Sequence, residues 1–71
     1  MKAYTEDEAK RLEGRIEVFS DTRMYPRKRA IEIAAQKLDK GWRPIIISHK
    51  RPSASGRTIT RYLPGQWRTR T

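Results

Sequence analysis

The shortage of apolar residues is the strongest constraint on how this chain can fold. The chain has 71 residues, of which 35% are hydrophobic, and its mean hydropathy is −0.95. A chain of this length has room for one domain with one small core, and its margin of stability is thin. The apolar residues therefore have to be gathered on a few faces, and their spacing indicates which segments form the core.

One apolar stripe at helical spacing predicts the main helix, over residues 26–40. Proline at position 26 suits the first turn, where its missing N–H is not needed, and glycine at position 41 suits the residue after the last turn. The residues of the stripe are Ala30, Ile31, Ala34, Ala35 and Leu38. This stripe has to be buried, so we expect the helix to cover one face of a sheet.

Three segments predict an antiparallel sheet beneath the helix. Residues 15–19 and 57–63 alternate in side-chain polarity, and residues 43–50 contain three consecutive isoleucines. A run of Pro, Ser, Ala and Gly at 52–56 favours a hairpin turn between the last two strands. The predicted fold class is α+β, with a β-α-β-β core at residues 15–63.

The two ends of the chain are expected to add little to this core. Thr5-Glu6-Asp7-Glu8 matches a helix capping box and predicts a short helix within residues 1–14, which Gly14 ends. Pro64-Gly65 favours a turn, after which residues 64–71 form a short strand or a tail. Residues 1–71 are then a single domain, with one main helix on a three-stranded antiparallel sheet.

The composition argues against most kinds of catalytic or cofactor chemistry. Cysteine is absent, and the lone histidine, His49, lies near a strand end beside two cations, which is typical of a surface residue. No apolar run exceeds the three isoleucines at 45–47, so we expect no membrane span, no signal peptide and a cytoplasmic location. We also expect no cofactor, no metal site and no enzymatic activity.

Basic residues are concentrated in the second half of the chain. The whole sequence has 17 Lys and Arg against 8 Asp and Glu, a formal net charge of +9, and residues 40–71 contain no acidic residue. The same segment includes both tryptophans and a run of isoleucines, which is the composition of folded strands and not of a disordered tail. A basic surface on a folded unit is expected, and with it an acidic partner.

Seven cations are the candidate binding residues. Three open the main helix, where positive charge opposes the helix dipole, and four lie on the predicted hairpin. They are Arg27, Lys28, Arg29, Lys50, Arg51, Arg57 and Arg61. Arginine forms bidentate contacts with phosphate, and affinity for nucleic acid increases with each phosphate neutralised. We expect these side chains to form one basic face.

Two classes of function fit this pattern. The first is a small nucleic-acid-binding accessory protein that uses the Arg- and Lys-rich face of the hairpin. The second is a regulator or inhibitor of the kind encoded by phages and mobile elements, which docks on an acidic surface of a larger host protein such as a nucleic-acid-processing enzyme. The sequence contains no helix-turn-helix, cold-shock or RNP motif that would choose between DNA and RNA.

Overall fold

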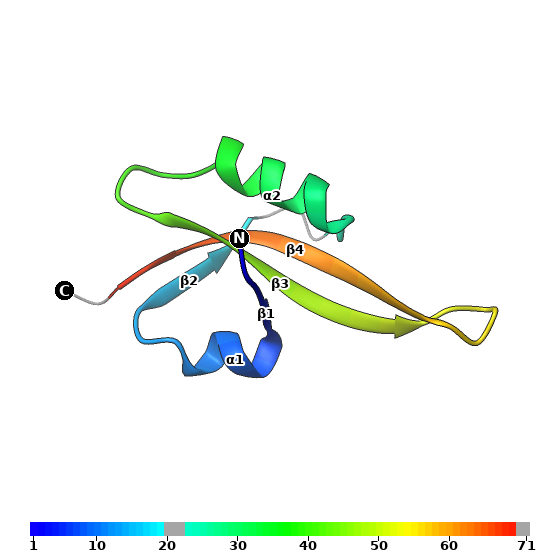
Figure 1. Cartoon of the computed structure of the whole chain (residues 1–71). Coiled ribbons are helices and arrows are strands. Elements are labelled where there is room, and N and C mark those ends of the chain that lie inside the picture. The colour runs from blue at the N-terminus through cyan, green and yellow to red at the C-terminus, as the bar shows by residue number, and fades with distance from the viewer. Residues whose placement is uncertain (20–22, 70–71) are drawn as a thin grey trace.

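The computed structural model describes residues 1–19 and 23–69 as two helices packed on one sheet. In chain order the elements are β1 (Ala3–Thr5), α1 (Glu6–Arg11), β2 (Arg15–Val18), α2 (Arg27–Gln36), β3 (Arg43–Pro52) and β4 (Thr58–Arg68). The strands lie in the order β1-β3-β4-β2, with α2 on one face of the sheet and α1 on the other (Figure 1). The predicted α+β class is confirmed.

The sheet differs from the predicted one in its strand number and direction. Instead of three antiparallel strands, the described residues form four strands, and β1 runs parallel to β3 with Tyr4 opposite Ile47. The three predicted strands do pair in antiparallel fashion, and the structure shows that β4 lies between β3 and β2. Three residues are too few to show an alternating pattern, so β1 had no sequence signal. Its position depends on pairing with β3, where the Ser48 hydroxyl also donates to the Tyr4 carbonyl at 3.3 Å.

Helix α2 is shorter than the predicted 26–40 and ends at Gln36. The N–H of Lys37 donates to the Ile33 carbonyl at 3.0 Å, and the chain then leaves the helical path. The positive φ of Gly41, +88°, belongs to a separate turn before β3, closed by the Trp42 N–H on the Asp39 carbonyl at 3.1 Å. Gly41 therefore shapes the entry to β3 and does not cap the helix.

The buried stripe of α2 is also different from the predicted one. Ala30, Ile33 and Ala34 are buried, whereas Ala35 is exposed and Ile31 is only half-buried. Leu38 lies outside the helix and is half-buried. Both stripes have helical spacing, so the pattern alone did not distinguish them, and packing against β3 and β4 selects the one that contains Ile33.

The predicted turn at Pro64-Gly65 is wrong, because β4 continues without a break to Arg68. The Pro64 carbonyl accepts from the Phe19 N–H at 3.2 Å, just beyond the end of β2. In an antiparallel sheet the N–H and C=O of one residue point toward the same neighbouring strand, so the nitrogen of Pro64 also faces the β2 side. The β2–β4 pairing ends at Val18 and Gly65, so the N–H that proline lacks is not needed there. A Cβ on Gly65 would lie 2.8 Å from the Glu17 carbonyl oxygen, so glycine allows β2 to approach.

The core occupies both faces of β3. Ile45, Ile46 and Ile47 are all buried. Ile47 lines a hollow together with Ala9 of α1 and Ile16 of β2, so it lies on the α1 side of the sheet. Alternation along the strand then places Ile46 on the α2 side. Burial on both faces explains why β3 contains a continuous apolar run and not an alternating one.

A buried glutamine fastens the loop after α2 to the sheet. Gln66 in β4 is 3% exposed, and its Nε2 donates to Glu17 Oε1 at 3.1 Å and to Asp39 Oδ2 at 2.9 Å. Its Oε1 accepts from the Asp39 N–H at 2.9 Å. Because these bonds satisfy the buried amide, the residue joins β4, β2 and the loop at little desolvation cost.

The capping box at the start of α1 is confirmed and leads to a pH-dependent prediction. The Glu8 N–H donates to Thr5 Oγ1 at 3.1 Å, and the Thr5 N–H donates to Glu8 Oε1 at 3.0 Å. The bond from the Thr5 backbone holds the pKa of Glu8 below its usual 4.5. The pKa of this carboxyl is lower in the folded protein than in the unfolded chain, so its charged form stabilises the fold at pH values above the unfolded-state pKa. This stabilisation is lost as the pH falls through the folded-state pKa.

Replacing Glu8 with Gln is therefore expected to make stability less sensitive to acid. Thermal melting at neutral pH and near pH 3 should show a smaller drop in Tm for Glu8→Gln than for the parent, because one acid-sensitive contact is gone. Glu13→Gln is the matched control, since the Glu13 side chain has no hydrogen bond or ion pair among the described residues. Equal acid sensitivity in the parent and Glu8→Gln would contradict the role of the capping carboxylate.

Candidate functional site

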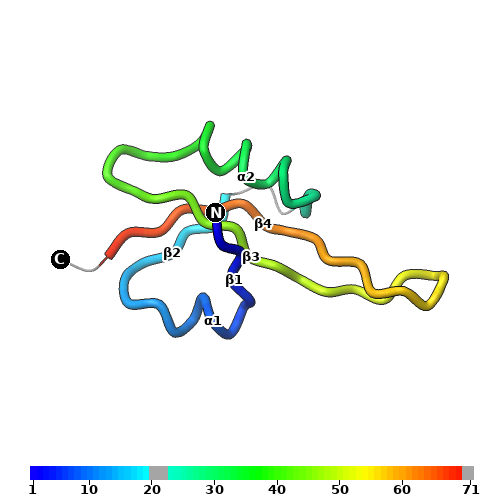
Figure 2. Tube along the Cα trace, viewed as in Figure 1, coloured from blue at the N-terminus to red at the C-terminus, as the bar shows by residue number. Residues whose placement is uncertain are grey.

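The hairpin of β3 and β4 extends beyond the rest of the fold as a two-stranded arm (Figures 1 and 2). β1 pairs with β3 only as far as Ser48, and Tyr25 pairs with β4 at Tyr62. Past these two positions, residues 49–61 pair only with each other in the described part of the chain, and we call them the hairpin arm. The arm contributes to the elongated shape of the molecule, which measures 45 × 25 × 20 Å.

Hydrogen bonds within the loop give the tip of the arm a defined shape. The Ser53 N–H donates to the Arg57 carbonyl at 2.7 Å, and the Gly56 N–H donates to the Ser53 carbonyl at 3.0 Å. The Ser53 hydroxyl accepts from the Arg57 N–H at 3.2 Å and lies 2.9 Å from the Ser55 hydroxyl. Gly56 has a φ of +83°, which favours glycine at this position. The predicted hairpin turn is confirmed.

Strand alternation distributes the cations of the arm over both of its faces. Arg51 and Arg61 lie on one face, which is also the face of Ile47, while Lys50 lies on the other face with Ile46. Arg57 is in the loop at the tip. The four predicted hairpin cations are thus gathered on the arm, but the expectation that they share one face is wrong.

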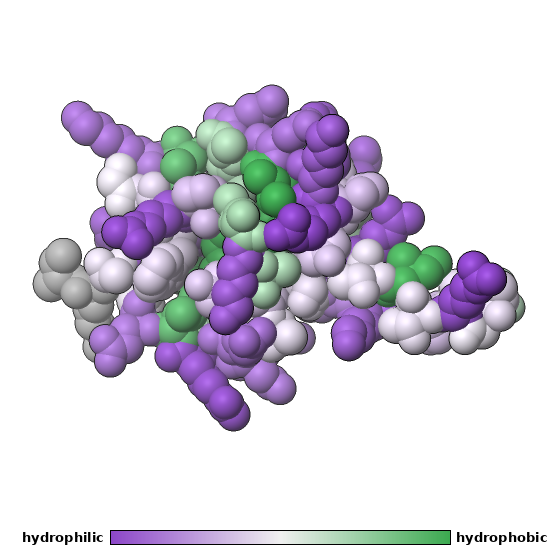
Figure 3. Space-filling model, viewed as in Figure 1, coloured by the Kyte–Doolittle hydropathy of each residue, from purple (hydrophilic) through white to green (hydrophobic). Residues whose placement is uncertain are grey.

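The cations of the arm are exposed and have no internal partner. The charged side chains of Lys50, Arg51, Arg57 and Arg61 form no hydrogen bond or ion pair with any described residue. The arm contains no acidic residue, and at the right of Figure 3 its surface combines hydrophilic side chains, side chains of intermediate hydropathy and a hydrophobic patch. Like charges held close together repel, so the arm has an unbalanced positive field that an acidic partner would relieve.

The first turn of α2 brings further cations to the base of the arm. Tyr25 exchanges backbone hydrogen bonds of 2.9 Å with Tyr62, and α2 begins two residues later at Arg27. Because α2 covers the Ile46 face of the sheet, this turn lies on the same side as Lys50. Arg29 Nη1 pairs with Glu32 Oε2 at 3.1 Å, and the Arg27 guanidinium donates to the Met1 carbonyl. Lys28 has no such partner among residues 1–19 and 23–69, which distinguishes it from the other two cations of this predicted trio.

The arm also contains the lone histidine of the chain, which was not among the predicted binding residues. His49 lies directly opposite Arg61 in the register and is half-buried at the base of the arm. It shares the face of Arg51. A histidine next to two cations in sequence was the signal, but its cross-strand neighbour became evident only from the pairing of β3 with β4.

The tryptophans lie at the opposite end of the sheet from the arm. Arg43 is paired with Trp67 there, and its guanidinium lies 6.0 Å from the centre of that ring. Arg68 stacks over Trp42 at 4.7 Å, and Trp67 Nε1 donates to the Glu13 carbonyl at 3.1 Å. Both indole rings are half-buried in these contacts. They serve packing at that end and are remote from the cations of the arm.

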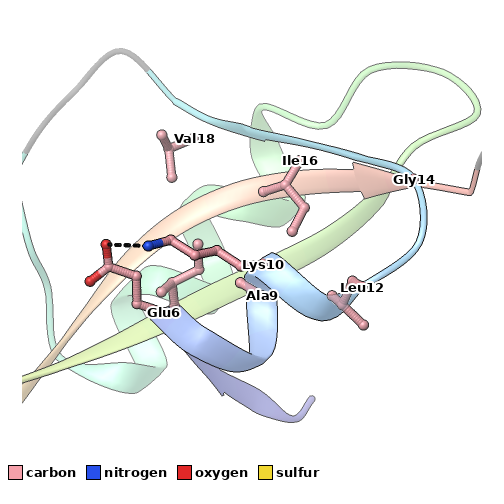
Figure 4. A pocket seen from close by; sticks show the side chains of 8 residues that line it. Glu6, Ala9, Lys10, Leu12, Gly14, Ile16 and Val18 are labelled. Atoms are coloured by element: carbon pink, nitrogen blue, oxygen red, sulfur yellow. Dashed lines mark ion pairs between the residues drawn. The ribbon is translucent and has the colours of Figure 1, made fainter.

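Helix α1 borders two hollows, one of which reaches the base of the arm. The first, of about 330 Å³, is mainly apolar and lies between α1 and β2, with the Glu6–Lys10 ion pair of 4.0 Å at its side (Figure 4). The second, of about 420 Å³, lies between the start of α1 and β3 beside His49 and Lys50. Within residues 1–19 and 23–69, no cluster of three or more His, Asp and Glu side chains is arranged to hold a metal ion.

Comparisons with models of known protein families, with curated proteins and with solved structures give no significant match to this chain. In the part of the chain that the structure describes, no helix is long and apolar enough to cross a bilayer.

Proposed function

We propose that this protein binds nucleic acid through the hairpin arm, assisted by the first turn of α2. The observation that supports this most directly is the set of four exposed cations on an arm that has no acidic residue and no internal ion pair. Phosphates neutralised by Lys and Arg release condensed counterions, and this release drives binding that does not depend on sequence. Three of the four cations are arginines, which suit bidentate phosphate contacts.

Folding alone does not account for these cations. The buried residues of β3 end at Ile47, and those of β4 begin at Pro64. The arm lies between these two positions in the sequence, so it adds no fully buried apolar residue to the core. Its charges repel each other without a compensating contact. Residues that oppose stability in this way tend to mark functional surfaces, because some other interaction has to retain them.

Direct binding measurements test the proposal. Purified protein is titrated into labelled duplex DNA, single-stranded DNA and RNA while fluorescence anisotropy is followed from 50 to 200 mM salt. Four phosphate contacts predict a slope of log affinity against log salt of about −3.6 on duplex DNA, or a loss of roughly 100-fold over this range. Absence of binding to every nucleic acid at the lowest salt would contradict the proposed function.

The open edges of the arm favour one alternative, docking on an acidic protein. Beyond Ser48 and Tyr62, neither outer edge of the arm is paired with a described residue, and such edges accept a strand from a partner. A pull-down from lysate with and without nuclease treatment separates the two functions. A protein that is retained after nuclease treatment and lost when Arg51 and Arg61 are replaced by alanine would favour this second function.

A further inference from the structure

The cations of the arm lie on both of its faces and at its tip. Lys50 is on one face, Arg51 and Arg61 are on the opposite face, and Arg57 is at the tip. A ribbon that lies flat on a polyanion neutralises phosphates with one face only, and the cations of its other face remain in water. Two negatively charged walls, one on each side of the arm, would attract the cations of both faces at once.

The dimensions of the arm fit the major groove of B-form DNA. Sheets stack about 10 Å apart, so a ribbon with its side chains is about 10 Å thick, and the major groove is about 12 Å wide and 8.5 Å deep. The His49–Arg61 pair and the Pro52–Thr58 pair are three residues apart along β3. At about 3.3 Å per residue this gives roughly 10 Å of ribbon below the loop, enough to reach the floor of the groove.

We propose that the arm enters the major groove of duplex DNA tip first, an inference that rests on the proposed nucleic-acid binding. Lys50 and the first turn of α2 contact the phosphates of one wall, while Arg51 and Arg61 contact those of the other. Because Arg61 is at the base of the arm, it stays level with the rim, where the phosphates are. The body of the protein, which begins at Ser48 and Tyr62, remains outside the groove.

The chemistry of the tip is consistent with close approach to base edges. Residues 53–56 are Ser, Ala, Ser and Gly, so no bulky side chain blocks the end of the arm. The hydroxyls of Ser53 and Ser55 are adjacent, and hydroxyl groups can donate to or accept from base edges. Arg57 lies beside them, and arginine is the residue that most often contacts guanine in the major groove.

The same geometry disfavours double-stranded RNA. The major groove of A-form RNA is deep and too narrow for side chains to enter and read, so the arm would reach only the outer phosphates. A single strand has no groove with two walls. The arm is therefore expected to bind duplex DNA in preference to double-stranded RNA and single strands.

Two sets of measurements test the inference with the full chain. Random-sequence duplex DNA is compared with the same DNA containing glucosylated hydroxymethylcytosine, whose sugars fill the major groove, and with DNA whose minor groove is occupied by netropsin. Glucosylation should weaken binding by about tenfold or more, because the contacts with both walls are lost together, whereas netropsin should leave it unchanged. Duplex RNA should also bind more weakly than duplex DNA.

The second set of measurements compares the two faces of the arm by their salt dependence. Lys50→Ala should reduce the slope of log affinity against log salt by about 0.9, and Arg51→Ala/Arg61→Ala should reduce it by about 1.8. Lys10→Ala, on α1, is the matched control for Lys50→Ala and should leave the slope unchanged. Melting curves check that each variant folds, which is expected because these side chains are exposed.

Equal affinity for glucosylated and unmodified DNA would overturn the inference and leave the proposed function standing. A reduced salt slope in only one of Lys50→Ala and Arg51→Ala/Arg61→Ala would also overturn the inference. An arm held between two walls uses the cations of both of its faces. If none of the nucleic acids binds, the proposed function itself fails. Each failure thus has a distinct result.

Discussion

Replacing Arg51, Arg57 and Arg61 together with alanine should abolish most nucleic-acid binding and leave the fold intact. Three phosphate contacts, as in the proposed function, account for about 2.7 in the slope of log affinity against log salt, which corresponds to a loss of more than about 100-fold at 0.1 M salt. If Arg57 contacts base edges instead, the slope should fall by about 1.8. The three side chains are exposed and repel one another, so their removal should leave Tm unchanged or slightly higher.

A control with the same change in net charge separates local contacts from the overall field. Lys10→Ala/Arg11→Ala/Arg15→Ala removes three cations from α1 and β2, away from the arm. Its binding should decrease far less, since only long-range attraction is reduced and salt screens that attraction beyond about 10 Å. If both triple variants lose affinity equally, binding depends on net charge alone, and the arm is not the interface.

Replacing Ile33 with alanine should destabilise the protein much more than the same change at Ile31. Ile33 is 6% exposed and packs in the core, so its truncation should cost about 2–5 kcal/mol. A chain of this length has a total stability of roughly 4–10 kcal/mol, so the variant loses a large share of it. Ile31, which is half-buried on the same helix, should cost clearly less.

Chemical denaturation of both variants measures this difference. Both substitutions replace isoleucine with alanine within α2, and in both the small change in helix propensity favours alanine. The difference between their free energies of unfolding therefore reports the burial of the two sites. Equal destabilisation, or a larger loss at Ile31, would show that α2 packs on the stripe that the sequence alone suggested.

Several local features were predictable because each depends on residues close together in the chain. The capping box needs only Thr5 and Glu8, and the hairpin needs two strand-like segments joined by a short turn-forming run. The cations of the arm were found from composition, since residues 40–71 contain no acid. Regular alternation along residues 57–63 also predicted correctly that Arg61 and Thr60 lie on opposite faces.

The wrong predictions concern choices that depend on distant residues. Pro64-Gly65 has the sequence of a turn, but β2 pairs alongside it and allows β4 to continue. The expectation of a single basic face failed because cross-strand pairing, which places Lys50 opposite Thr60 and Arg51 opposite Ile59, assigns each cation to a side.

The sequence by itself determined the α+β class, the main helix, the hairpin and the cations at its end, because spacing and turn chemistry act over a few residues. Only the tertiary structure decided that β1 joins β3 in parallel, that Ile33 and not Ala35 faces the sheet, and that the arm is basic on both faces. The physical reason is that the spacing of apolar or charged residues indicates a helix or a strand but does not indicate which other element packs against it. Which of two faces is buried is settled by the free energy of packing against elements that lie far away in the chain.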